Sequence, residues 1–95
     1  SVAKNKNTST KTLEKLSEDL FVRHSVTSNP NTSSETLDKL SNDEDWTIRI
    51  LVASKPNTST KTLEKLSEDK EWEIRERVAM NHNTSSKTFS FLYTN

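Results

Sequence analysis

Apolar residues recur along the chain in a short cycle, and each cycle contains two different spacings. The first is a pair three residues apart, which places both side chains on one side of a short helix. These pairs are Leu13 and Leu16, Leu37 and Leu40, Leu63 and Leu66, and Phe89 and Leu92. The second is a β-branched residue followed four positions later by Val, as in Ile48 with Val52 and Ile74 with Val78. Each cycle therefore predicts two short helices and no strand.

The cycle is an internal repeat at the level of sequence. The motif Asn-Thr-Ser begins at Asn7, Asn31, Asn57 and Asn83, with spacings of 24, 26 and 26 residues. The segment NTSTKTLEKLSED occurs identically at 7–19 and 57–69. We divide a single domain, 1–95, into units at about 7–30, 31–56 and 57–82, a partial unit at 83–95 and the end of a preceding unit at 1–6. The first unit matches the others if two positions are deleted before Leu20, and we expect the array to have continued in a longer parent protein.

Polar residues at the unit boundaries predict where helices begin and end. We expect the first helix of each unit to be capped by the threonines Thr8, Thr32, Thr58 and Thr84. Thr32 is followed three residues later by Glu35, which predicts a capping box. Asp45 and Glu71 suit the start of the second helix. Because the chain has no glycine, the asparagines of the linkers are expected to adopt the left-handed conformation that ends a helix.

Composition limits what such units can do alone. With 95 residues, of which 28% are hydrophobic, one unit of about 25 residues cannot bury its apolar stripe, so the units must stack and at least three are needed. The chain has 14 basic and 14 acidic residues and no cysteine, so disulfides, thiolate metal sites and a cysteine nucleophile are excluded. No apolar run reaches the length of a membrane helix, and we expect no membrane insertion.

The stretch NPNTSSETLDKLSNDEDWTIRILVASKPNTS resembles the leucine-rich repeat variant, whose units run roughly NPxTPxxxLxxLAxDxDxxVRxxVAxNP. The resemblance extends from Val2 to Leu92 and implies an all-α, right-handed superhelical solenoid of two-helix repeats related to HEAT arrays. In that family α-helices alternate with shorter helices, often of the 3₁₀ type. Some members carry an iron–sulfur module bound through cysteines, which this chain lacks, so we expect no cofactor and no metal.

A row of arginines follows the β-branched positions, and each arginine comes shortly after an aspartate. One interpretation is a row of guanidinium groups that binds carboxylates or phosphates of a ligand. The alternative, which we prefer, is an internal Asp–Arg ladder that joins neighbouring units, because a half-buried guanidinium requires a paired carboxylate. The predicted ladder consists of Asp19, Arg23, Asp43, Arg49, Asp69 and Arg75.

Trp46 and Trp72 occupy equivalent positions in consecutive units and are the best candidates for a contact surface. The alternative, packing over the corner between the two helices of a unit, is the more common use of such residues. Ile50 and Arg77 stand at positions that differ between units, and we include both as candidate partner contacts.

Several other chemistries are disfavoured by the sequence. Lys15, Lys39 and Lys65 each follow an acidic residue, so this row is expected to be a solvated face and not a nucleic-acid groove. His24 and His82 have no second ligand at a suitable spacing, and nothing resembles an activated nucleophile. The Asn-Thr-Ser sequons are explained by the linkers, and whether they are modified stays open. We therefore expect no enzymatic activity.

The leading functional hypothesis is a non-catalytic scaffold for protein–protein interaction, with an unidentified protein partner. A structural spacer array in a bacterial cell-surface or secreted protein is the second hypothesis, and a HEAT-like nucleic-acid binder is the third. Cytoplasmic and cell-surface settings both stay open. The ends carry no obvious polar cap, so end-to-end association of copies is also open.

Overall fold

The computed structural model describes residues 19–94, and every regular element in that range is an α-helix. A helical segment at 19–28 is followed by α2 (Ser34–Leu40), α3 (Trp46–Ser54), α4 (Thr60–Leu66), α5 (Trp72–Met80) and α6 (Ser86–Thr94). The prediction of an all-α chain is thus confirmed over 19–94, without any 3₁₀ helix there. The elements expected at 1–6 and around Thr8, Leu13 and Leu16 lie outside the described residues.

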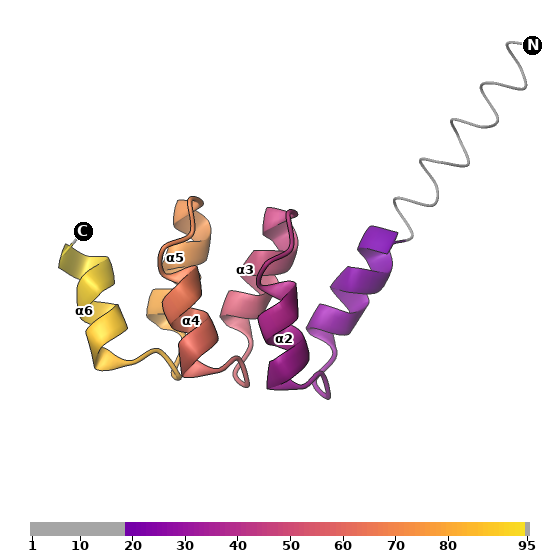
Figure 1. Ribbon diagram of the computed structural model, residues 1–95, viewed down its shortest axis with the longest axis horizontal. Helices are drawn as coiled ribbons and strands as arrows, with labels where there is room; N and C mark the ends of the chain where they lie inside the picture. Colours follow the sequence, from indigo (N-terminus) through magenta and orange to yellow (C-terminus); the bar gives the residue numbers. More distant parts are fainter. Residues whose placement is uncertain (1–18, 95) are drawn as a thin grey trace, which may run out of the picture.

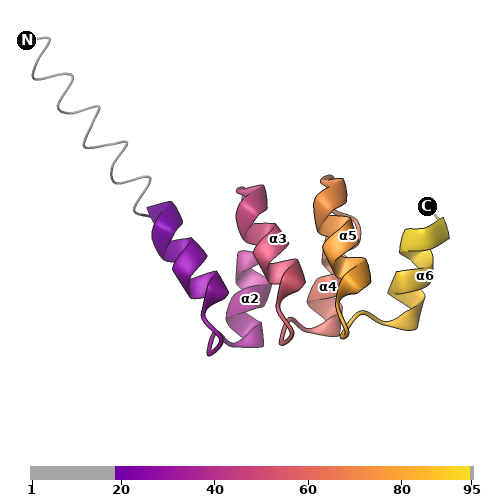
Figure 2. The same cartoon turned by 180° about the vertical axis from the view of Figure 1, so that it is seen from behind.

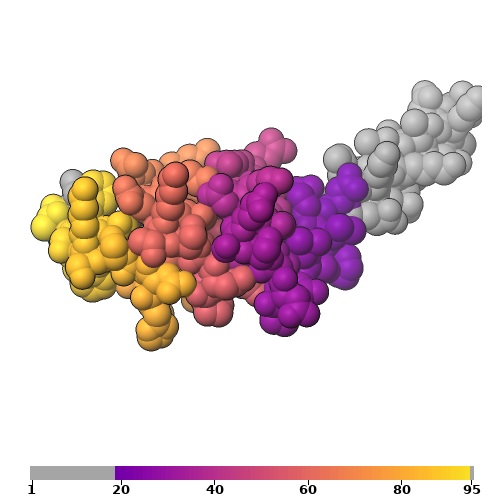
Figure 3. Space-filling model, turned by 60° about the horizontal axis from the view of Figure 1, so that its bottom comes forward, coloured from indigo at the N-terminus to yellow at the C-terminus, as the bar shows by residue number. Residues whose placement is uncertain are grey.

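The helices form two layers that run along one long body. Figure 1 shows α2 and α4 in front of α3 and α5, and the view from behind in Figure 2 reverses that order. The segment 19–28 and α6 lie at opposite ends, and Figure 3 shows the described segments following one another in chain order. The body extends 60 × 30 × 15 Å along its principal axes. Its short third dimension leaves room for only these two layers.

The core lies between the layers, where the two apolar stripes of each unit meet. It comprises Leu37, Val52, Ala53, Leu63, Leu66, Ile74 and Val78, with Leu40, Ile50 and Leu92 packed against it. Burying one of the Leu, Ile or Val side chains stabilises the fold by about 1.5–3 kcal/mol. Val22 and Val26 hold the positions of Ile48 and Val52 in the first unit, yet both are exposed. The segment 7–18, whose sequence is repeated at 57–68 around α4, lies outside the described residues.

The prediction that threonines cap the first helix of each unit is wrong, because the caps lie one residue later. Ser33 and Ser59 are the N-caps of α2 and α4, and their hydroxyls accept from the amides of Thr36 and Thr62. Ser85 accepts from the amide of Thr88 in the same way. The expected capping box of Thr32 and Glu35 is therefore absent, and a serine–threonine pair closes the first turn instead.

The preceding threonine serves the helix before it. Thr58 is fully buried, and its hydroxyl donates to the carbonyl of Val52 at 2.5 Å. Thr84 donates to Val78, and Thr32 to Val26. A buried carbonyl at a helix end needs such a donor, since an unpaired one would cost about 1–3 kcal/mol. In each of these units the Thr hydroxyl thus pairs with a carbonyl at the end of one helix, while the Ser that follows it caps the start of the next helix.

The expectation that linker asparagines take a left-handed conformation is also wrong. No residue in the described part of the chain has a positive φ. Instead, the side-chain oxygen of Asn29 accepts from the amide of Asn31, and Asn81 accepts from the amide of Asn83. These turns within the local backbone reverse the chain without the left-handed region, which explains how a glycine-free sequence forms tight linkers.

Candidate functional site

The arginines and aspartates of the predicted ladder pair across unit boundaries. Arg23 Nε lies 2.8 Å from Asp43 Oδ2, and Arg49 Nε lies 2.8 Å from Asp69 Oδ2. Each arginine therefore pairs with the aspartate of the following unit, twenty residues later in the chain. Both side chains of the Arg49–Asp69 pair are 9% exposed, whereas Arg23 is 38% exposed and Asp43 10%. The second pair is thus a buried, bidentate contact, and the first is only half-buried.

The arginines also donate to the backbone of their own unit. Arg49 Nη1 donates to the carbonyls of Asp43 and Glu44, and Arg75 Nη1 donates to the carbonyl of Asp69. Arg75 makes no ion pair within residues 19–94, and Asp19 is exposed in the helical segment 19–28 without an ion pair there. The structure thus brings together four of the six ladder residues as two ion pairs.

A second set of contacts between units was not predicted from the sequence. In the linkers, Asn57 Nδ2 donates to the carbonyl of Thr32, and Asn83 Nδ2 donates to those of Pro56 and Thr58. Lys55 Nζ donates to the carbonyls of Ser28 and Asn29. The recurrence of Asn before every Thr-Ser was the available signal, but it did not show that the amide would cross to the preceding unit.

The row of acidic and basic residues on the first helices also links units. Asp38 on α2 accepts from the Thr62 hydroxyl at 2.7 Å and lies 3.2 Å from the Lys65 ammonium, both on α4. The hydrogen bond from Thr62, followed by that from Lys65, lowers the pKa of Asp38 below its ordinary value of 3.8. The predicted solvated face is therefore exposed but not free of contacts.

The lowered pKa of Asp38 predicts a dependence of stability on pH. Because the folded state favours the ionised carboxylate, this stabilisation is present above about pH 4 and is lost as the pH falls through the lower, folded pKa. Replacing Thr62 with Val should raise the Asp38 pKa toward 3.8, since it removes the first cause. Carboxyl NMR titration measures this pKa, and Thr62→Ser, which keeps a hydroxyl, is the control. An unchanged pKa in Thr62→Val would contradict the assignment.

The tryptophans lie at the first position of α3 and α5 and are substantially exposed. Trp46 is 45% exposed and Trp72 is 60% exposed, so neither is fully covered by the rest of the protein. Ile50, one turn after Trp46, is half-buried and packs against the core. Arg77 is exposed, but five residues after Trp72 it points about 140° away around α5. The four candidate contacts therefore do not form one patch. Trp46, Trp72 and Arg77 are exposed, and of these only the two tryptophans occupy equivalent positions in consecutive units.

The histidine of the first unit has a structural partner. His24 Nε2 lies 2.9 Å from Thr47 Oγ1, and the Thr47 hydroxyl in turn donates to Asp45, the N-cap of α3. The Thr47 side chain, then its backbone amide, lowers the pKa of Asp45.

Within the described residues, no three His, Cys, Asp or Glu side chains are grouped as a metal site would require. Between residues 19 and 94, no helix has the length and apolarity to cross a membrane.

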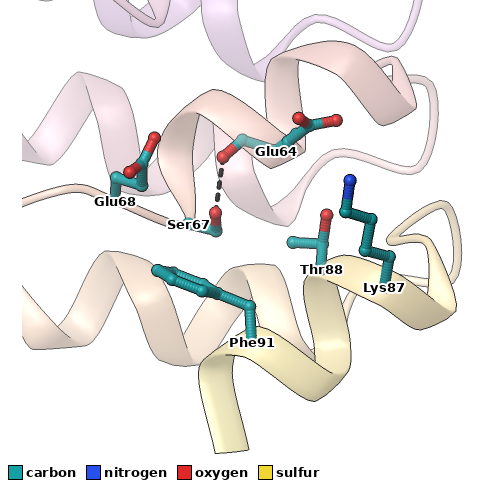
Figure 4. A pocket seen from close by; sticks show the side chains of 6 residues that line it. All are labelled: Glu64, Ser67, Glu68, Lys87, Thr88 and Phe91. Carbon is teal, nitrogen blue, oxygen red and sulfur yellow. Dashed lines mark hydrogen bonds between the residues drawn. The ribbon is translucent and has the colours of Figure 1, made fainter. Parts of the chain in front are cut away.

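A pocket of about 180 Å³ lies between α4 and α6 (Figure 4). Its lining is Glu64, Ser67, Glu68, Lys87, Thr88 and Phe91. In Figure 4, Phe91 and Glu68 lie toward one end of the pocket and Lys87 toward the other. Sequence reasoning identified Glu64 only as one member of the solvated row and did not identify this pocket.

Comparison with known proteins gives no relative from which the role of these residues follows. No family model, no curated protein and no solved structure matches the chain.

Proposed function

We propose that the chain is a non-catalytic protein-interaction module, a right-handed superhelical solenoid of the leucine-rich-repeat-variant or HEAT-like kind. The observation that carries this proposal is the exposure of Trp46 and Trp72 at the starts of α3 and α5. Large aromatic side chains contribute strongly to protein interfaces because they bury much area at a small cost in conformational entropy.

The scaffold beneath the tryptophans supports a binding role. The helices that carry them pack on a common core, and the buried Arg49–Asp69 pair and the Asn57 amide join the units that contain them. Contacts that fix neighbouring helices also fix the separation of the two rings. A partner then meets a preorganised surface, so less free energy is spent on ordering it during binding.

Replacing Trp46 and Trp72 together with Ala should weaken binding of a purified partner, first identified by affinity capture, by at least about thirtyfold. The reason is the loss of two exposed anchors. Calorimetric titration measures the affinity. Because both rings are largely outside the core, far-UV circular dichroism should show unchanged helix content.

Met80→Ala is the matched control, since Met80 is an exposed, large side chain at the opposite end of α5 from Trp72. It should bind like the unmodified chain. Equal affinity of the double tryptophan variant and the Met80 variant would refute the proposed surface.

A structural spacer is the second candidate, and the cross-unit contacts favour it. Side chains of Arg49, Asn57 and Asn83 each join one unit to its neighbour, which stiffens a rod along its length. A spacer would retain its function in the double tryptophan variant, so the same experiment separates the two candidates.

A further inference from the structure

The pocket between α4 and α6 stands where an ion pair stands between α2 and α4. A shift of 26 residues along the sequence relates the two places. The pocket is lined by Glu64, Ser67, Glu68, Lys87, Thr88 and Phe91. These positions are equivalent, in the same order, to Asp38, Ser41, Asn42, Lys61, Thr62 and Lys65. The chain therefore provides an internal comparison between a filled and an open version of one site.

In the filled version, an ammonium group occupies the site. Lys65 Nζ lies 3.2 Å from Asp38 Oδ1 and within 3.5 Å of the Asp38 carbonyl, and the Thr62 hydroxyl donates to the same carboxylate oxygen. The acidic residue on one helix, and the threonine and lysine on the next, thus define a place for a cation.

In the open version, two substitutions reverse the charge. Phe91 replaces Lys65, and Glu68 replaces Asn42, so two lysines and one aspartate become one lysine and two glutamates. Neither Glu64 nor Glu68 makes an ion pair within residues 19–94. The buried Thr88 accepts from Ser85 as Thr62 does from Ser59, but its side chain faces the pocket without a hydrogen bond to Glu64 in the described residues. The site thus lacks a counterpart of the Lys65 ammonium and has a second carboxylate.

We propose that this pocket binds the primary ammonium group of a lysine side chain from a protein partner. That the lysine comes from a protein partner rests on the proposed function. The ammonium lies between the carboxylates of Glu64 and Glu68, and the lysine methylenes and charge lie against the Phe91 ring. In Figure 4 Lys87 and the Glu64 carboxylate lie toward one end of the pocket and Glu68 and Phe91 toward the other, so the incoming ammonium is placed in the space between the two glutamates. The pocket is open to solvent, so a single lysine binds weakly and adds to a larger interface.

Nα-acetyl-lysine methylamide is the probe, and NMR of the full chain is the measurement. Titration should give saturable shifts of the Phe91 ring and the Thr88 methyl group, with a dissociation constant on the order of 1–10 mM. The norleucine analogue, which has the same stem without the charge, should give none. Equal shifts from both probes, or no saturable shift from the lysine probe, would overturn the proposal.

Two variants test the placement of the cation. Glu64→Gln with Glu68→Gln should reduce affinity at least tenfold, because both carboxylates are lost. Phe91→Lys should abolish binding, because it restores the internal cation seen at Lys65. Tyr93→Lys adds the same charge to an exposed position on α6 and should retain binding within about twofold. Unreduced affinity in either of the first two variants would overturn the placement, and circular dichroism verifies that each remains helical.

The variant with Trp46 and Trp72 replaced by Ala separates this inference from the proposed function. It should bind the lysine probe normally, since neither tryptophan lines the pocket. Probe binding together with unimpaired partner capture would refute the tryptophan surface alone. Absence of probe binding together with tryptophan-dependent capture would refute the lysine pocket alone.

Discussion

Replacing Arg49 with methionine is expected to lower the free energy of unfolding by about 3–5 kcal/mol. The substitution keeps the apolar stem but removes the guanidinium, which leaves the Asp69 carboxylate without its ion-pair partner at 9% exposure. The carbonyls of Asp43 and Glu44 also lose their donor. Urea denaturation measures the change. It is followed by circular dichroism at about 222 nm, where the signal reports helix content.

Arg23→Met is the matched control, because it removes the same group from the equivalent ion pair one unit earlier. Asp43 is 10% exposed, close to the value for Asp69, but Arg23 is 38% exposed and its guanidinium donates to no backbone carbonyl within residues 19–94, so the expected loss is smaller, about 1–3 kcal/mol. A loss of similar size in both variants would show that burial does not determine the strength of these pairs.

Leu63→Ala is the second large prediction and should cost about 2–5 kcal/mol of unfolding free energy. Leu63 is fully buried on α4, in a cluster with Val78 of α5 and Leu37 of α2. The shortened side chain leaves a cavity at the contact between units, which the rigid neighbours fill only in part. Thermal and urea unfolding monitored by circular dichroism measure the loss.

The corresponding control is Met80→Ala, an apolar truncation at a position that is 67% exposed, where the change should stay within about 0.5 kcal/mol. If Met80→Ala were as costly as Leu63→Ala, the core would not lie between the two layers.

The existence and order of the helices could be predicted from the sequence because their apolar spacings are unambiguous. The spacing of Leu63 and Leu66 suits one side of a short helix, and that of Ile74 and Val78 suits the next. The structure places all four in one core, in α4 and α5. The spacing of apolar residues indicates which side of a helix is buried, and it can be read from a few consecutive residues.

The exact caps could not be predicted, because two adjacent hydroxyl residues compete for the same role. Thr58 and Ser59 are both acceptable N-caps by residue type. The choice depends on the carbonyl of Val52, which lies six residues earlier and is buried by the fold. Likewise, the pairing of Arg49 with the aspartate of the next unit depends on how the units stack, and the sequence repeat alone allows either Asp43 or Asp69.

The candidate site was predicted only in part for a related reason. Trp46 and Trp72 were identified from the sequence, but their exposure depends on neighbours that residue type does not define. The pocket depends on side chains from two helices that are 26 residues apart in register. The signal in the sequence was the row formed by Lys15, Lys39 and Lys65, because the equivalent position in the next unit is Phe91. This break in the row would have identified the pocket.

The linker residue Asn81 has a consequence for the time at which the chain becomes structured during synthesis. Its side-chain amide donates to the carbonyls of Ala53 at 2.8 Å and Lys55 at 2.9 Å, at the end of α3. These donors emerge 28 and 26 residues after their acceptors. At about 5–20 residues per second, a ribosome needs about 1–6 s to supply them. During that interval water must hydrogen-bond the carbonyls at the end of α3. Each unit therefore reaches its final structure only after the ribosome has synthesised the next one.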